Sequence, residues 1–152
     1  MDWDAFDFFV AGTLVTAVGV TYALAARRTD STAYRTAVGL ALAAAFVLVW
    51  LSLGVGIIGK DGDPANRMYF GVLGVGIVGA LVARFRPRGM ARAMVATAIA
   101  QAGVAAYAVF AGLGRPWSGP LELSLLNGFF VALWLASAWL FRRAARGRAE
   151  AA

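Results

Sequence analysis

Hydrophobic residues occur in long runs along this chain, and short clusters of charged and polar residues separate the runs. A helix needs roughly 20 apolar residues to cross a ~30 Å hydrocarbon core at about 1.5 Å per residue. Several runs approach this length without a charge, and none alternates as a barrel strand would. The pattern therefore predicts an all-α, polytopic transmembrane helix bundle in a single domain, 1–152, with spans at about 8–26, 37–59, 68–83, 93–114 and 123–141.

The connections between these runs differ in charge from one side of the predicted bundle to the other. Eleven arginines lie after the first, third and fifth runs, whereas the other connections hold three cations. Because cytoplasmic loops of membrane proteins are rich in Lys and Arg, we expect the N-terminus outside and the C-terminus in the cytoplasm. The acidic N-terminus agrees and lacks the basic start of a signal peptide. In the alternative, the third run does not cross the membrane. Arginine-rich and arginine-poor connections would then no longer alternate between the two sides.

Composition supports this class and narrows the chemistry. Of the 152 residues 61% are hydrophobic, against about 45–50% in soluble domains. The chain has no cysteine and no histidine, which removes disulfides and the usual haem and zinc ligands. The chain has a net charge of +6, but its cations are concentrated in the connections on one side of the predicted membrane. Their distribution is explained by topology, so we expect no nucleic acid partner. Abundant arginine and alanine are typical of a GC-rich bacterial genome, and we expect a multi-pass protein of the bacterial inner membrane.

Ionisable residues are missing from the centres of all five runs. Asp7 and Glu122 lie at the outer ends, Arg84 at an inner end, and Lys60 in a connection. Buried charges in spans mark proton and ion pathways, so their absence argues against ion-coupled transport. No nucleophile, base or metal-ligand set converges, and we expect no catalytic residues, no metal and no cofactor.

A few polar and aromatic side chains within the runs are candidates for ligand contacts. Gln101, near the middle of the fourth run, either contacts a ligand or makes an interhelical hydrogen bond worth about 0.6 to 2 kcal/mol, and the second interpretation is favoured. We expect Asn127 to satisfy a helix terminus. Trp50 and Trp134, at mid-span, either line a pocket for a quinone, carotenoid or lipid tail or fill the core. Five rings near the expected interfaces are expected to anchor helices: Trp3, Trp117, Trp139, Tyr34 and Tyr69.

Small residues recur at helical spacing and allow helices to approach closely. In the third run, glycines spread over more than half of the helix circumference, which places this helix in the middle of the predicted bundle. Rows of small residues also occur in the second and fifth runs. The residues are Gly71, Gly74, Gly76 and Gly79 in the third run, Ala37, Ala41 and Ala45 in the second, and Gly128, Ala132 and Ala136 in the fifth.

The outer connection 60–67, KDGDPANR, concentrates polar groups. Asp61 and Asp63 fit the first two ligand positions of a calcium loop, but the pattern then fails. The structural interpretation is favoured: Asp61 begins a turn, Asp63 caps the third helix, and Pro64 takes its first position. A looser cation site remains the alternative, and the candidate ligand or partner contacts on this side are Asp61, Asp63, Asn66 and Glu122.

The inner connection RFRPRGMAR is the densest cluster of charge. We expect Pro87 and Gly89 to end the third helix and let the chain reverse before the next one. Cations at a cytoplasmic surface attract anionic headgroups at about 1 kcal/mol each. The expected contacts with anionic lipid, or with an acidic cytoplasmic partner, are Arg84, Arg86, Arg88 and Arg92.

Two motifs, DPANRMYFGVL and ARFRPRGMARA, lie in the central half of the chain. Together with the run VGLALAAAFVLVW they resemble a family of short hypothetical bacterial inner-membrane proteins. The resemblance, from about residue 38 to 101, implies a membrane topology and adds no catalytic residues.

These observations predict a non-catalytic membrane protein. The chain has rows of small residues suited to helix packing, and it lacks reactive groups. Together these features favour an accessory, assembly or stabilising subunit of a membrane complex, or a homo-oligomer. The alternative is a passive carrier or channel for a small neutral solute or lipid. Its lining would comprise the glycines of the third run together with Gln101, Thr97, Ser52 and Asn127.

Overall fold

The computed structural model describes residues 4–54, 56–59, 64–116 and 119–151, without the side chains of residues 28, 53 and 148–151. Each of the five α-helical segments in this part of the chain is long and apolar enough to cross a membrane, the third when the short 3-10 helix η1 is counted with α3. The prediction of an all-α fold with five candidate spans is confirmed. The elements are α1 (Ala5–Arg28), α2 (Thr32–Gly54), η1 (Pro64–Arg67), α3 (Met68–Val82), α4 (Pro87–Phe110) and α5 (Pro120–Ala151).

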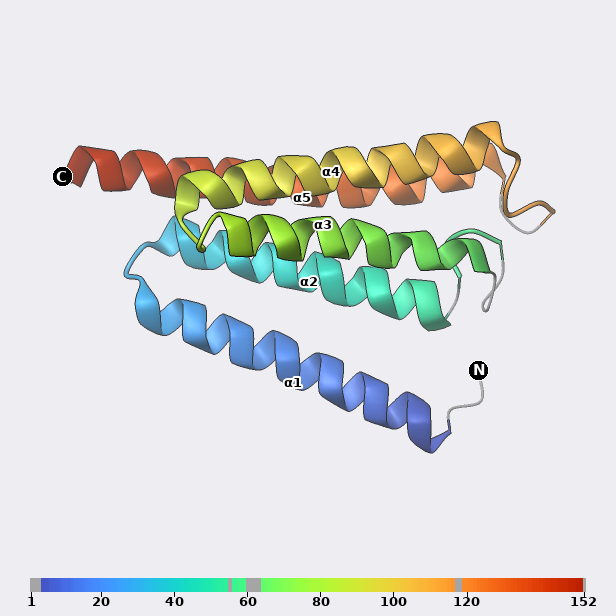
Figure 1. Cartoon of the computed structure of the whole chain (residues 1–152), viewed down its shortest axis with the longest axis horizontal. Helices are drawn as coiled ribbons and strands as arrows, with labels where there is room; N and C mark the ends of the chain where they lie inside the picture. Colours follow the sequence, from blue (N-terminus) through green and yellow to red (C-terminus); the bar gives the residue numbers. More distant parts are fainter. Residues whose placement is uncertain (1–3, 55, 60–63, 117–118, 152) are drawn as a thin grey trace.

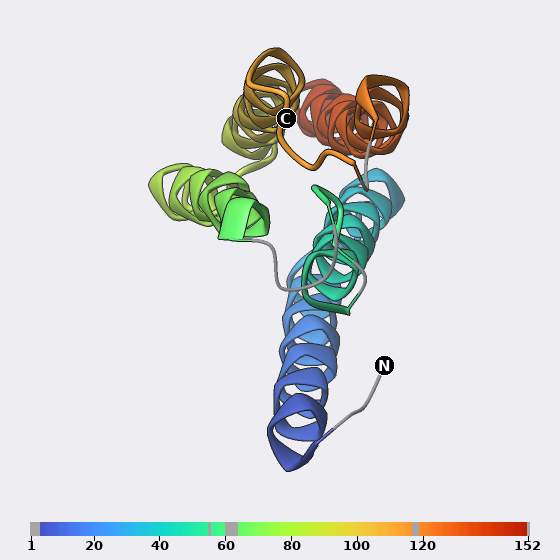
Figure 2. The ribbon, with the colours of Figure 1, turned by 90° about the vertical axis from the view of Figure 1, so that its right-hand side faces the viewer.

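Helices α2 to α5 lie side by side and form the bundle, whereas α1 stands apart from it (Figures 1 and 2). The α5 helix packs against both α4 and α2, and α3 packs mainly against α4. The α1 helix packs against α2, and the two separate towards the N-terminus (Figure 1). No residue in the apolar span of α1 is buried. The core of the protein is therefore built by four of the five helices.

The helices begin and end at different residues from those that hydropathy predicts. The second run was expected to span 37–59, but α2 ends at Gly54, and Gly56 and Gly59 with positive φ of 86° and 73° redirect the chain. In contrast, α4 begins at Pro87 rather than at 93, and α5 continues to Ala151 rather than to 141. Arginine side chains extend from a helix to the membrane surface, so helical structure continues where the apolar run stops.

The connection between α3 and α4 corrects the role expected for Gly89. Two other residues, Arg84 and Phe85, reverse the chain with φ of 53° and 58°. Gly89 instead lies inside α4, where an added Cβ would be 2.5 Å from the Cβ of Ala83. It is therefore required for a close approach, not for a turn. The Tyr34 hydroxyl of α2 donates to the carbonyl oxygen of Phe85 at 2.6 Å and ties this connection to the bundle.

The glycines of α3 do not place that helix in the middle of the bundle, so this prediction is wrong. A Cβ on Gly79 would be 2.8 Å from the Cβ of Ala93, and Gly76 also faces α4. In contrast, Gly71 and Gly74 have nothing within 4 Å of an added Cβ. In the described structure the α3 glycines that face another helix, Gly76 and Gly79, both face α4. The α3 helix packs mainly against α4 and only weakly against α2, whereas α5 packs extensively against both α4 and α2.

The two alanine and glycine rows also have different positions. Ala37 in the row on α2 is fully buried, and its carbonyl oxygen accepts a hydrogen bond from the Ser137 hydroxyl of α5 at 2.8 Å. The row on α5, Gly128, Ala132 and Ala136, is exposed. The first row packs helices together within the chain, and the second faces outwards.

Local capping fixes both ends of α1. At its start, Asp4 and Asp7 form a capping box in which each side chain accepts from the other residue's backbone N–H, at 2.9 and 3.0 Å. At its end, the Arg35 guanidinium of α2 donates to the carbonyl oxygens of Ala26 and Thr29, at distances of 2.8 to 3.1 Å. These bonds satisfy carbonyls that a helix terminus leaves without partners, and they hold α1 to the bundle at one end only.

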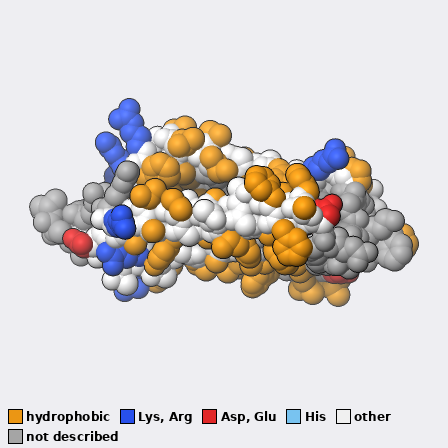
Figure 3. Space-filling model, turned by 90° about the horizontal axis from the view of Figure 1, so that it is seen from below, with side chains coloured by type: hydrophobic (Ala, Val, Ile, Leu, Met, Phe, Trp, Pro, Cys, Tyr) orange, Lys and Arg blue, Asp and Glu red, His pale blue; other side chains and the backbone are white. Residues whose placement is uncertain are grey.

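Charge is distributed unevenly along the molecule. On the face shown in Figure 3, most of the visible Lys and Arg side chains lie at one end, and hydrophobic side chains occupy the length between the two ends. We call this the arginine end and the other the loop end. The arginine end comprises the last turn of α1, the start of α2, the α3–α4 connection, the start of α4 and the tail of α5. The side chains of Arg28 and Arg148, also expected there, lie outside the described residues.

Candidate functional site

A chain of hydrogen bonds between side chains joins α3, α4 and α5 inside the bundle; we call it the polar chain. The Tyr69 hydroxyl and the Gln101 amide nitrogen both donate to Oδ1 of Asn127, at 3.0 and 2.9 Å. The Trp134 indole N–H donates to Oε1 of Gln101 at 3.0 Å. Asn127 in turn donates to the carbonyl oxygen of Leu123 at 2.8 Å. The four polar side chains therefore hold three helices in one register.

These groups are shielded from solvent and satisfy one another. The four side chains of the polar chain are between 0% and 2% exposed. Two other buried hydroxyls, those of Thr97 and Ser52, donate to the carbonyl oxygens four residues earlier in their own helices, at 2.8 and 2.7 Å. Within the described residues, every buried side-chain nitrogen and oxygen has a hydrogen-bond partner. The arrangement is suited to holding helices together, and it presents no unused polar group to a ligand.

The polar chain agrees with one expectation from the sequence and corrects two others. The interhelical hydrogen bond expected of Gln101 is present. Asn127 does not satisfy a helix terminus, because α5 begins at Pro120, and its side-chain oxygen is the shared acceptor. Tyr69 does not anchor an interface, because it is 1% exposed. Since seven residues are about two helical turns, the spacing of Asn127 and Trp134 already places them on one face of α5.

The two tryptophans expected at mid-span lie in different environments. Trp134 is 2% exposed and belongs to the polar chain, whereas Trp50 is 37% exposed and stacks on Phe46 with ring centroids 5.9 Å apart. The two rings therefore do not line a common pocket. Trp134 fills the core and donates a hydrogen bond there.

Asn66 organises the connection between α2 and η1. Its Oδ1 accepts from the backbone N–H groups of Ile57 and Ile58, both at 2.9 Å, and its Nδ2 donates to the carbonyl oxygen of Ile58 at 3.0 Å. Asn66 is 5% exposed, and both isoleucines are buried. The amide expected as a ligand contact acts here as a clamp on the backbone.

The acidic candidates of the loop end do not form a site within the described structure. Glu122 is exposed in the first turn of α5. Asp61 and Asp63, with the predicted turn and helix cap, lie outside the described residues. In the ranges that the structure describes, no three Asp, Glu, His or Cys side chains lie close enough to hold a metal ion. The helix expected from Pro64 onwards does begin there, as η1.

Exposed cations are the main feature of the arginine end. The four arginines predicted to contact lipid, Arg84, Arg86, Arg88 and Arg92, are all exposed, the first two in the α3–α4 connection and the others in α4. In α5 the Arg143 guanidinium lies 5.3 Å from the ring centroid of Trp139. Trp139 is 57% exposed, as expected for a ring that anchors a helix. Arg142 and Arg146 are exposed as well.

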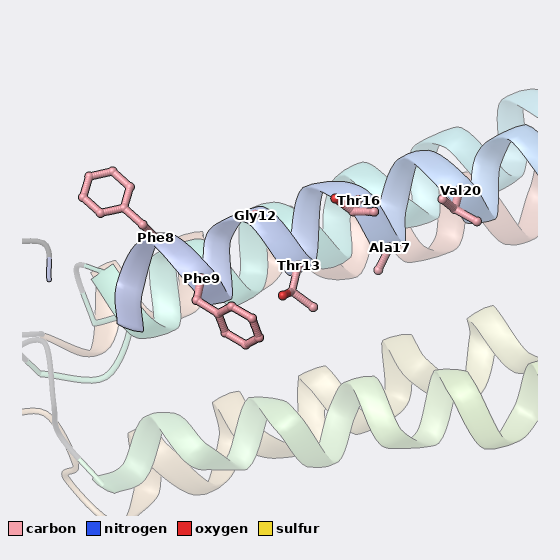
Figure 4. A pocket seen from close by; sticks show the side chains of 7 residues that line it. All are labelled: Phe8, Phe9, Gly12, Thr13, Thr16, Ala17 and Val20. Carbon is pink, nitrogen blue, oxygen red and sulfur yellow. The ribbon is translucent and has the colours of Figure 1, made fainter. Parts of the chain in front are cut away.

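Two shallow hollows mark the surface. One follows a single face of α1, where small residues lie between larger ones, and Figure 4 shows Phe9, Thr13 and Ala17 pointing to the same side of that helix. The other lies between α4 and α5, and both are open rather than enclosed. The first is lined by Phe8, Phe9, Gly12, Thr13, Thr16, Ala17 and Val20; the second includes Ala102, Ala105, Ala106, Ser124, Gly128 and Val131.

No protein-family model, curated protein or solved structure matches this chain. The class of protein that the fold defines is an all-α bundle with five helices apolar enough to span a membrane.

Proposed function

We propose that this protein is a non-catalytic integral membrane protein that acts as an accessory, assembly or stabilising subunit of a membrane complex, or as a homo-oligomer. The observation that carries the proposal is α1, whose apolar span has no buried residue although it is as long as the core helices. The interior, in contrast, is closed by the polar chain. In the described part of the chain, the exposed apolar surface of α1 is available for contacts with other proteins. The buried polar side chains already have hydrogen-bond partners within the chain.

The surface area of the chain supports the same proposal. A compact chain of 15.9 kDa is expected to expose about 7,400 Å², whereas this chain exposes 9124 Å². A standard interface between proteins buries roughly 800 Å² on each partner. The excess, roughly 1,700 Å² relative to that size rule, exceeds one partner's share. Covering α1 with neighbouring transmembrane helices would bring the protein close to an ordinary compactness.

The proposed location is the bacterial inner membrane, with the arginine end in the cytoplasm and the N-terminus outside. The support is the charge rule for loops and the gathering of the described arginine-rich connections at one end of the bundle. Membrane lipids are proposed partners at this end, and nucleic acid is not.

A passive carrier or channel is the competing proposal, and the internal geometry favours it less. Gln101, Thr97 and Asn127, which would line its path, are bonded to one another or to backbone carbonyls. A solute flux in liposomes that disappears in Gln101→Leu, with the fold retained, would support the competing proposal.

Purification from native membranes in a mild detergent tests the main proposal. We expect the protein to migrate with other chains, or with further copies of itself, and Gly12→Leu to weaken that association by filling the hollow on α1. Thr21→Leu is the control, because Thr21 is exposed on the same helix, does not line the hollow and, nine residues from Gly12, lies on the opposite side of the helix. An added Cβ at Gly12 meets nothing within 4 Å inside the chain, so the larger side chain should not disturb the fold. A monomer, or equal effects of the two variants, would count against the proposal.

A further inference from the structure

The hollow between α4 and α5 lies on the exposed side of this helix pair, and we call the hollow, together with the continuation of the same two helix faces towards the arginine end, the groove. It is lined by Ala102 and Ala106 of α4 and by Gly128 and Val131 of α5. Residues three or four apart lie on the same face of a helix. The same side of both helices can therefore be followed from this hollow, near the loop end, towards the arginine end.

On α4 this face changes from apolar to cationic. Steps of three or four residues lead from Ala102 to Ile99, Val95, Arg92 and Arg88. Ile99 is 67% exposed, and both arginines are exposed. The face is therefore apolar along most of the helix and carries two cations where α4 begins.

The facing stripe on α5 has the same order of side chains. From Val131 the steps lead to Leu135, Trp139, Arg142 and Arg146. Leu135 and Trp139 are 45% and 57% exposed, and the two arginines are exposed. Two independent helices thus present an apolar stripe that ends in a pair of arginines.

The hydrogen bonds of the polar chain fix how far α4 and α5, and with them the two stripes, are shifted along each other. Gln101 bonds to both Asn127 and Trp134, so it lies opposite the midpoint between them. The helices run antiparallel with the same rise per residue, so moving from Gln101 to Arg88 corresponds to moving along α5 to about residue 144. Packed helices are about 8–10 Å apart. The four arginines therefore flank one end of the groove at a common height.

We propose that this groove is a binding site for an anionic phospholipid. The phosphate headgroup lies between Arg88 and Arg92 of α4 and Arg142 and Arg146 of α5, and an acyl chain follows the apolar part of the groove. Guanidinium groups bind phosphate oxygens through two parallel N–H donors, and Arg is suited to such contacts at a surface. Tryptophan at headgroup height, here Trp139, is typical of a membrane interface.

The order of side chains along the groove favours a lipid over other anions. A free phosphate would be held by the arginines alone, whereas the exposed apolar stripes of Ile99 and Leu135 continue from them along the membrane. An acidic protein segment would cover the cations without using these stripes. A phospholipid contacts both features, because its charged headgroup lies at the membrane surface beside the arginines and its acyl chain lies in the hydrocarbon along the apolar stripes.

Retention of lipid in native mass spectrometry tests the proposal. The protein would be purified in detergent and mixed with equal amounts of phosphatidylglycerol and phosphatidylethanolamine. We expect one phosphatidylglycerol to be retained preferentially, and Arg88→Gln/Arg142→Gln to reduce its retention about 25-fold, at about fivefold for each arginine. The matched control, Arg84→Gln/Arg86→Gln, removes two cations of the same end that also face lipid headgroups but lie in the α3–α4 connection, outside the groove. Because salt screens their attraction for a headgroup held between α4 and α5, we expect a change of less than about threefold.

Several results would overturn the proposal. Equal losses in the two double variants would show that only the overall charge of the arginine end attracts lipid. Displacement of the retained lipid by an excess of glycerol phosphate would identify a site for free phosphate. Equal retention of the two lipids would exclude a site for an anionic headgroup. Failure of this test leaves the subunit proposal intact, because co-purification from native membranes is measured independently.

Discussion

Replacing Asn127 by leucine should destabilise the bundle more than its volume change explains, because Asn127 is the shared acceptor of the polar chain. The substitution removes the acceptor for the Tyr69 hydroxyl and for the Gln101 amide, in a region where both donors are fully buried. Hydrogen bonds between transmembrane helices contribute on average about 0.6 kcal/mol and at most about 1.7. Two lost bonds, with two donors left without acceptors, predict a loss of about 2 kcal/mol in the free energy of unfolding.

A double-mutant cycle separates this mechanism from simple loss of packing. Tyr69→Phe alone removes one bond and is expected to cost about 0.6 to 1 kcal/mol. In the background of Asn127→Leu the same change should cost close to nothing, because the hydroxyl that it removes no longer has an acceptor. The two mutations act on groups in contact, so their effects are expected to be non-additive.

Equilibrium unfolding in lipid bicelles, followed by tryptophan fluorescence, gives these energies. Thr36→Val is the control: it removes an exposed hydroxyl that bonds only to the carbonyl oxygen of Thr32 in its own helix, and we expect a change below about 0.5 kcal/mol. If Tyr69→Phe has the same cost with and without Asn127, the proposed role of the polar chain in stability is refuted.

Three further predictions concern packing, the loop end and orientation. Gly79→Ala should destabilise the protein by about 1 to 3 kcal/mol, because its Cβ would meet α4 at 2.8 Å, whereas Gly74→Ala, in open space, should not; equal thermal shifts would contradict this. Asn66→Ala should speed hydrogen exchange of the two backbone N–H groups that it clamps by about tenfold or more, and unchanged exchange would contradict the clamp. Because the chain has no cysteine, an impermeant maleimide should label Glu122→Cys in intact cells and Arg86→Cys only after permeabilisation; the reverse order would invert the proposed orientation.

Hydropathy predicted the number and approximate place of the five helices, because crossing a membrane imposes a length and a composition on each one. The boundaries were less accurate for physical reasons. Gly56 and Gly59 end the second helix within an apolar run, and the arginines of α4 and α5 are helical although they are charged. The turn at Arg84 and Phe85 is not encoded by glycine or proline at those positions, so the residue pattern pointed to Pro87 and Gly89 instead.

Contacts between helices were harder to predict than the helices themselves. A polar side chain such as Gln101, deep in an apolar run, needs a partner in hydrocarbon, and this alone predicted its interhelical bond. The identity of that partner depends on the register of α4 against α5, which one sequence does not specify. Glycine patterns were ambiguous too, because Gly74 faces outwards and Gly79 faces α4. The separation of α1 from the bundle has no sequence signal, since lipid and protein are both apolar surroundings.

If this protein functions within an assembly, its native particle should be heavier than one chain with lipid. Membrane discs cut out with an amphipathic polymer keep the surrounding lipid and any bound chains, and native mass spectrometry then reports the protein content of each disc. We predict particles that contain at least one further protein chain, either a second copy or a partner, and that lose it in Gly12→Leu but not in Thr21→Leu. Discs that hold a single 15.9 kDa chain with lipid alone would rule out the proposed assembly.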